Sequence, residues 1–221
     1  MILTICFYIM LFCSMFVVAF NCIILYKNQM PTFYKVVTYG LFGFMLTRVF
    51  LVLLIASGGN ENDFSLGVLG QVCAYMFFSI ANSKYVPREG EDRLKVRLCV
   101  PAMIFAFVLA GMYVLAAAVS GTLGAIVSEV LYAFSVSSSA YWAIRNIVNQ
   151  YHNAHRRCLT GFNICLCILA FCNAAYELVL ALSSSVDVTL LTCVLSAGSG
   201  TAMVMSVILL KKGMIRWKEI S

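Results

Sequence analysis

The sequence predicts an all-α membrane protein, a bundle of about seven transmembrane helices with its N-terminus outside the cell and its C-terminus in the cytoplasm. Of the 221 residues, 62% are hydrophobic and only 11% are charged, whereas soluble domains contain roughly 45–50% apolar and 25% charged residues. Apolar stretches, each long enough to cross a hydrocarbon core about 30 Å thick, occupy nearly the whole chain. We therefore expect residues 1–221 to form a single transmembrane domain.

Charged residues delimit the apolar stretches. The first stretch is too long for the apolar region of a signal peptide and has no basic segment before it, so we interpret it as a retained span. The expected spans are 2–26, 36–57, 64–81, 98–120, 123–144, 159–183 and 186–210, with ends placed to within a few residues.

The connections alternate between short acidic or neutral ones and longer basic ones. Gly58–Asp63, Gly121–Thr122 and Ser184–Ser185 are short, which predicts antiparallel hairpins. Residues 82–97 mix both charge signs with proline and glycine, which is typical of a solvated linker loop. Residues 211–221 form a short basic tail.

The basic residues decide the orientation. Fourteen of the 15 lie in the gaps after the first, third, fifth and seventh stretches, while the opposite face has Glu61, Asp63 and Asp187 and no basic residue. The positive-inside rule places the basic gaps in the cytoplasm. The net charge of +6 then reflects topology and contact with anionic inner-leaflet lipids rather than nucleic-acid binding. We expect a multi-pass protein of the plasma membrane.

An odd helix in the middle of seven allows a 3+1+3 plan, in which spans 1–3 and 5–7 run in the same direction as parallel repeats. The two halves share little more than a glycine near the start of spans 2 and 6, Gly40 and Gly161. The repeat is therefore an expectation from topology and not from sequence identity.

Three charged residues lie well inside the spans. Arg48 is about nine residues from the outer end of span 2, roughly 13 Å deep at 1.5 Å per residue. A charge at that depth costs a few kcal/mol or more and usually faces a partner or a water-filled cavity. Glu129 and Glu177 lie about six residues from the outer ends of spans 5 and 6. We therefore predict an outward-facing polar pocket between spans 2, 5 and 6.

In this pocket Arg48 pairs with Glu177 or Glu129, and the other carboxylate is left for a proton, a cation or a ligand amine. An ion pair that only fixes helix packing is an equally good interpretation, and glutamates that reach the outer interface are a third. Asn173 lies four residues before Glu177 and so on the same helical face, where it lines the pocket or forms an interhelical hydrogen bond.

No cofactor or metal site is predicted. The ten cysteines include no CxxC pair and are interpreted as small packing residues. His152, His155 and Cys158 recur every three residues before span 6, but contact with lipid headgroups explains them better than a metal. Because no hydrolase, P-loop or dinucleotide-binding motif is found, we do not expect an enzyme.

Seven spans with an external N-terminus resemble, in topology alone, parallel-repeat sugar and vitamin carriers, microbial rhodopsins and heptahelical receptors. The carriers' Pro-Gln motif and the receptors' arginine-aspartate and tryptophan motifs are absent. Residues 189–211 resemble the last helix of a microbial rhodopsin, but the retinal lysine of that family would fall near Gly200. Since no predicted span contains a lysine, the sequence excludes a Schiff-base retinal pigment.

Three function classes fit these observations. The leading one is a small permease or carrier for a small polar solute, because polar groups lie within the bilayer and the outer loops are short. The second is a seven-helix sensor or receptor that signals through a cytoplasmic partner protein. The third is a non-catalytic subunit of a membrane complex. Besides the lipid bilayer, the partners left open are the solute or ligand, a second copy of the chain, and a membrane or cytoplasmic protein.

Overall fold

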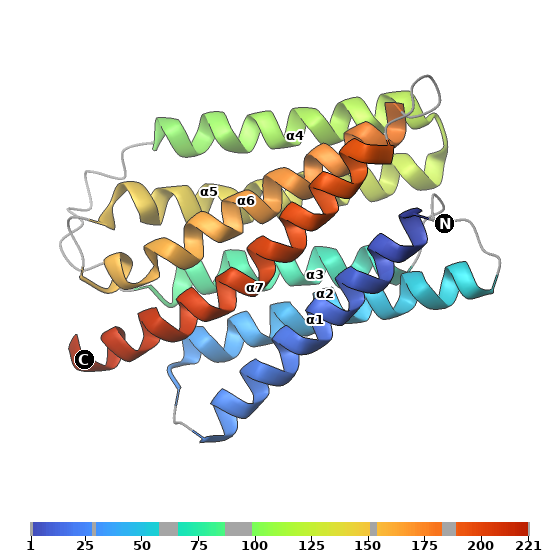
Figure 1. Ribbon diagram of the computed structural model, residues 1–221. Helices are drawn as coiled ribbons and strands as arrows, with labels where there is room; N and C mark the ends of the chain where they lie inside the picture. Colours follow the sequence, from blue (N-terminus) through green and yellow to red (C-terminus); the bar gives the residue numbers. More distant parts are fainter. Residues whose placement is uncertain are drawn as a thin grey trace.

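The structure is a computed structural model that describes residues 2–27, 30–57, 66–86, 99–150, 154–182 and 189–220. Every regular element in these ranges is a helix, as expected. The long helices lie alongside one another, with the two chain termini at opposite ends of the bundle (Figure 1). The helices are α1 (Ile2–Lys27), α2 (Thr32–Ala56), α3 (Leu66–Lys84), α4 (Val100–Ser120), α5 (Leu123–Val148), α6 (Ala154–Leu182) and α7 (Thr189–Ile220).

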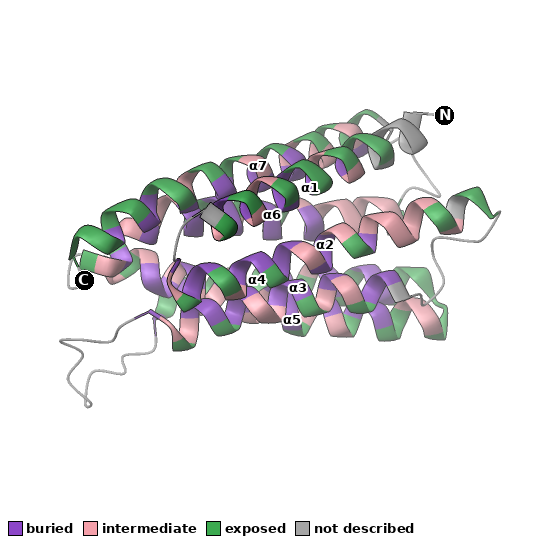
Figure 2. Cartoon of the chain, turned by 90° about the horizontal axis from the view of Figure 1, so that it is seen from below, coloured by how far each residue is buried: buried purple, intermediate pink, exposed green. Residues whose placement is uncertain are grey.

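Six of the described helices are long and apolar enough to cross a membrane, namely α1, α2, α4, α5, α6 and α7. The remaining helix, α3, has 19 residues and includes Gln71, Asn82 and Lys84. Large apolar side chains are exposed on the outward sides of the helices, among them Phe12, Leu53 and Phe134. Figure 2 shows exposed residues along the outer sides of the helices and buried residues where helices face one another. The chain thus has the architecture of a multi-pass integral membrane protein.

Most helices continue past the apolar stretches from which they were predicted, and they do so at the ends that carry basic residues. α2 begins at Thr32 rather than at residue 36, α5 ends at Val148 rather than at 144, and α6 begins at Ala154 rather than at 159. The predicted tail from residue 211 is helical as far as Ile220. A charge ends an apolar stretch but does not interrupt backbone hydrogen bonding, because long basic side chains can extend toward water.

The predicted two-residue connection between spans 4 and 5 is confirmed. Gly121 ends α4 with a φ of +67°, a left-handed conformation that glycine adopts at little cost. Thr122 then caps α5, as its Oγ1 accepts a 3.3 Å hydrogen bond from the backbone N–H of Ala125. Most of the predicted linker 82–97, from residue 87 onward, lies outside the described residues, as do the connections at Gly58–Asp63 and Ser184–Ser185.

The helix contacts form a closed ring. Following the ring, α1 packs on α2, α2 on α3, α3 on α5, α5 on α6, α6 on α7, and α7 on α1. The fourth helix, α4, lies outside this ring against α5 and α6. The chain has two halves on either side of α4, namely α1–α3 and α5–α7. In the ring these halves are in contact at two places, between α3 and α5 and between α1 and α7.

Small residues allow close helix crossings within the ring. A Cβ atom added to Gly43 of α2 would lie 2.7 Å from the carbonyl oxygen of Gly70 of α3. Beside this crossing, Thr47 donates a 3.0 Å hydrogen bond to the carbonyl of Gly67. A Cβ on Gly213 of α7 would likewise collide with the carbonyl oxygen of Cys158 on α6. Such contacts stabilise helix association in lipid, where van der Waals packing replaces the hydrophobic effect.

Candidate functional site

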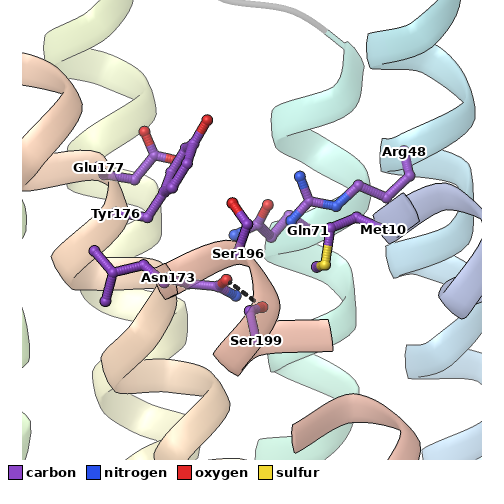
Figure 3. A pocket seen from close by; sticks show the side chains of 9 residues that line it. Met10, Arg48, Gln71, Asn173, Tyr176, Glu177, Ser196 and Ser199 are labelled. Carbon is purple, nitrogen blue, oxygen red and sulfur yellow. Dashed lines mark hydrogen bonds between the residues drawn. The ribbon is translucent and has the colours of Figure 1, made fainter. Parts of the chain in front are cut away.

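A polar cavity lies inside the ring, toward the end at which α2 ends and α3 begins. Five helices contribute to its wall, and the polar side chains of several point inward (Figure 3). Its volume, counted as space open to the centre of a water molecule, is about 20 Å³. A water needs about 10–15 Å³ on this measure, so the cavity holds one or two. It is lined by Met10, Arg48, Gln71, Asn173, Tyr176, Glu177, Leu195, Ser196 and Ser199.

Asn173 links three helices at this cavity. Its side-chain amide donates a 2.6 Å hydrogen bond to the Tyr75 hydroxyl on α3. Its amide oxygen accepts a 2.9 Å hydrogen bond from Ser199 on α7. Asn173, Tyr75 and Ser199 are all buried. The Asn173 amide thus uses its N–H group toward α3 and its oxygen toward α7, so that both ends of the amide are hydrogen-bonded.

Arg48 enters the cavity from the α2 side. Its guanidinium group points toward Gln71 and Ser196 in Figure 3, with Tyr176 and Glu177 across the cavity on α6. Arg48 also interacts electrostatically with the Tyr75 and Tyr132 side chains. A planar cation with five N–H donors, held in a cavity large enough for water, can bind an anionic or carbonyl group.

Two glutamates lie behind and beside the cavity. Glu177 lines it, whereas Glu129 on α5 is 9% exposed and is not among the lining residues. The two carboxyl groups are near enough to interact electrostatically. Tyr113 of α4 and Tyr132 of α5 pack against each other with ring centroids 5.8 Å apart, and both interact electrostatically with the two glutamates.

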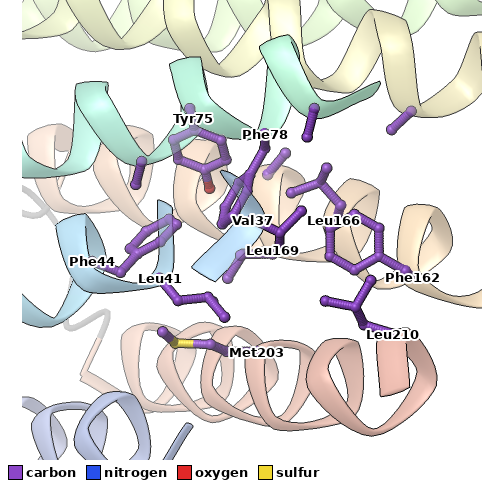
Figure 4. Packing of buried hydrophobic residues seen from close by; sticks show 14 of the residues in the cluster. Val37, Leu41, Phe44, Tyr75, Phe78, Phe162, Leu166, Leu169, Met203 and Leu210 are labelled. Carbon is purple, nitrogen blue, oxygen red and sulfur yellow. The ribbon is translucent and has the colours of Figure 1, made fainter. Parts of the chain in front are cut away.

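An aromatic layer lies next to the cavity, further toward the opposite end of the bundle. The Phe44 ring packs edge-on against Tyr75 at 5.2 Å between centroids and stacks on Phe78 at 5.9 Å. Phe78 in turn contacts Phe162 of α6 at 6.4 Å. Figure 4 shows these rings together with aliphatic side chains of α2, α6 and α7, such as Leu41 and Leu210. The layer fills the interior of the ring below the cavity.

The four residues predicted for the site therefore fall into one region. Arg48, Asn173 and Glu177 line the cavity, and Glu129 lies behind Glu177. The wall is formed by α1, α2, α3, α6 and α7, whereas the prediction placed spans 2, 5 and 6 around the pocket. For Gln71 and Ser199 the sequence favours an interhelical hydrogen bond or close helix packing over a role in lining a ligand site. A periodicity argument could not separate them from other small polar residues of the spans.

Comparison of the chain with models of known protein families, with characterised proteins and with solved structures finds no match.

Two further polar contacts join α3 to α5. The hydroxyls of Ser79 and Ser138 are 2.8 Å apart and share a hydrogen bond. Nearer the basic end, the Asn146 amide donates to the backbone carbonyl and to the side-chain oxygen of Asn82, each at 3.1 Å. With Tyr75, these contacts place polar side chains along the whole buried face of α3.

The opposite end of the bundle carries a separate hollow of about 400 Å³, lined by Met30, Lys211, Met214, Ile215, Lys218 and Glu219. Nearby, the His155 ring packs edge-on against Trp217 at 4.4 Å between centroids. His152 lies outside the described residues. In the ranges that the structure describes, no group of three or more His, Cys, Asp or Glu side chains is placed to hold a metal ion.

Proposed function

We propose that the protein is a small membrane carrier that binds a small polar solute in the Arg48 cavity. The observation that supports this most strongly is the convergence of a guanidinium, two amides, hydroxyls and a carboxyl group on one water-sized cavity inside a helical ring. Polar groups at this depth are costly unless they face a partner or water, and they commonly mark a solute pathway.

The two sides of the cavity favour a solute with two different polar ends. Arg48 and Gln71 present N–H donors on one side, which suit a carboxylate, phosphate or carbonyl group. Glu177 presents oxygens on the other side, which suit an amine or a hydroxyl group. A zwitterion such as an amino acid satisfies both, and a sugar acid or a vitamin with a carboxylate satisfies the first.

The cavity is smaller than such a solute, so binding requires the helices to separate at the cavity. We infer that this structure corresponds to a closed state of the transport cycle. The ring offers two natural places for movement, the α3–α5 and α1–α7 contacts, where the two halves of the chain meet. The ring order α1, α2, α3, α5, α6, α7 also places each helix opposite its counterpart in a 3+1+3 plan, which supports parallel repeats.

We also propose that α3 spans the membrane, so that seven spans connect an external N-terminus to a cytoplasmic C-terminus. Gln71 and Asn82 make α3 less apolar than its neighbours, but they are only 4% and 1% exposed. Because α3 hides these groups between α2 and α5, it does not present them to lipid. The positive-inside rule then sets the orientation through the basic residues at the inner ends.

A thermal-shift screen of the purified protein tests the binding site. Sugars, amino acids, vitamins, nucleosides and lipids are added singly, since a ligand that binds only the folded state raises the unfolding temperature. The screen is repeated with Arg48→Met and with Arg216→Met, the same substitution at an exposed position of α7. We expect a stabilising solute that acts on the wild type and on the Arg216 variant but not on the Arg48 variant.

Uptake of the stabilising compound into proteoliposomes then separates transport from other uses of the site. Uptake in the wild type, absent in Arg48→Met, supports a carrier. A stabilising compound that is bound but never transported would favour a receptor. Stabilisation that survives Arg48→Met would contradict the proposed site.

A further inference from the structure

Glu129 combines deep burial with an incomplete set of hydrogen bonds. The residue is 9% exposed, and its Oε2 atom is buried without a hydrogen-bond partner among the described residues. The Tyr113 hydroxyl, which belongs to the same cluster, is also buried and has no partner there. An ionised carboxylate in such a place would be very costly, since no donor of the described residues satisfies that oxygen.

The groups that surround Glu129 offer it little positive charge. α4 contributes Tyr113, α5 itself contributes Tyr132, and α6 contributes the carboxyl group of Glu177. α3 contributes Tyr75, which interacts with both Tyr113 and Tyr132. The positive charge that acts on this cluster is that of Arg48 on α2, which interacts electrostatically with Tyr132 and Tyr75.

Two neighbouring carboxyl groups in a low-dielectric interior do not both ionise readily, because each charge disfavours the other. A single proton shared by the pair removes this repulsion and gives the buried oxygen of Glu129 an O–H group in place of an unpaired charge.

We propose that Glu129 and Glu177 form a proton-binding pair and that solute transport is coupled to protons through it. This inference rests on the proposed carrier function, which it extends by naming the driving ion. Glu177 lines the cavity and so meets water and solute, whereas Glu129 is the buried member of the pair.

The position of the pair suggests an order of events. A proton that binds to the pair forms an O–H bond at Glu129, whose buried Oε2 atom has no other hydrogen-bond partner among the described residues. Glu177 is thereby left as a carboxylate beside the cavity, where it can attract the positive or donor end of a solute. Loss of the proton on the opposite side of the membrane returns the pair to its starting state.

Infrared spectroscopy of the protein in lipid vesicles tests the proton site without any solute. A protonated carboxyl group absorbs as a C=O stretch that shifts in heavy water, well separated from ionised carboxylates. We expect this band at neutral pH in the wild type and in Glu219→Gln, which alters an exposed glutamate at the far end of α7. The band is lost in Glu129→Gln. A wild-type spectrum without the band at neutral pH would overturn the proton site.

Uptake of a radiolabelled mixture of the common amino acids tests the coupling, with the membrane voltage clamped at zero. For one proton per solute, an inward gradient of one pH unit supports up to about tenfold accumulation. We expect the wild type and Glu219→Gln to accumulate amino acids when the pH gradient is present. In Glu129→Gln we expect the same uptake with and without the gradient. Wild-type uptake that is the same with and without the gradient would overturn the coupling while leaving the carrier intact.

The two measurements also separate the two proposals. If no amino acid is taken up but the infrared band is present, the amino-acid carrier is contradicted and the proton site stands. The wild type alone can overturn either proposal, whereas the assignment of the band to Glu129 rests on its loss in Glu129→Gln and its persistence in Glu219→Gln.

Discussion

Asn173 and Tyr75 are 98 positions apart in the chain, yet they are joined by a 2.6 Å hydrogen bond at the polar cavity. Asn173 also accepts a bond from Ser199, so a single amide holds α3, α6 and α7 in a fixed relation. The sequence left open whether Asn173 lines a pocket or bonds between helices. In the structure it does both, because the cavity is formed where these three helices meet.

Removing the hydroxyl of Tyr75 should weaken this junction. In Tyr75→Phe the Asn173 amide loses its acceptor in a buried site, and we expect the protein to be destabilised by about 1–2 kcal/mol. Thermal unfolding in detergent measures the change. Tyr39→Phe, at a position 57% exposed, serves as the control and should leave the unfolding temperature unaltered. Equal unfolding temperatures for the two variants would show that the bond adds no stability.

The crossing of α2 and α3 should tolerate no side chain at Gly43. The Cβ of Gly43→Ala would lie 2.7 Å from the backbone oxygen of Gly70, which cannot move without separating the helices. We expect a loss of about 1–3 kcal/mol, the usual cost of overpacking. The matched control is Gly111→Ala on α4, where the added Cβ meets nothing within 4 Å. This second variant should be neutral or slightly stabilised, since alanine favours the helix.

A double-mutant cycle can measure the contact between Ser79 and Ser138. Their hydroxyls share a 2.8 Å hydrogen bond between α3 and α5, one of the two places where the halves of the chain meet. Alanine at either position removes this hydrogen bond, so the losses of stability caused by the two single substitutions should not be additive. We expect a coupling energy of about 0.6–1.7 kcal/mol from unfolding measurements. Strictly additive effects would show that the bond contributes nothing.

The proposed topology predicts that the C-terminus and the connection between α6 and α7 face opposite sides of the membrane. A fluorescent protein fused after residue 221 should fold and fluoresce in the cytoplasm. An alkaline phosphatase fused after Ser184, between α6 and α7, should be active because it is exported. The opposite result for both fusions would invert the topology, and an identical location for both would mean that α7 does not cross the membrane.

The helices themselves were largely predictable, since each apolar stretch is long and all but a few of the charged residues lie between the stretches. Gly121 and Thr122 were likewise read correctly as a tight connection, because little more than two residues separated the adjoining stretches. The helix ends were less accurate. Residues 211–220 look like a solvated tail in sequence, but α7 continues through them and buries Met214 and Trp217 against its neighbours.

The site was only partly predictable, for a different reason. Arg48 and Glu177 are conspicuous because charges are rare within apolar stretches, and that rarity signals them without any knowledge of the fold. Gln71 and Ser199 are also part of the cavity, but neutral polar residues occur in many spans. Their role depends on the ring order of the helices, which no local pattern contains.

By itself the sequence determined that this protein lies in a membrane and that its elements are helices, because hydrophobicity and charge act residue by residue along each stretch. Only the tertiary structure decided which faces meet. It placed α4 outside the ring, α3 at the junction of the two halves, and Glu129 behind Glu177 and not at the cavity wall. The reason is physical: in lipid, helices associate through the detailed fit of small residues and a few hydrogen bonds, and that fit depends on pairs of residues far apart in the chain.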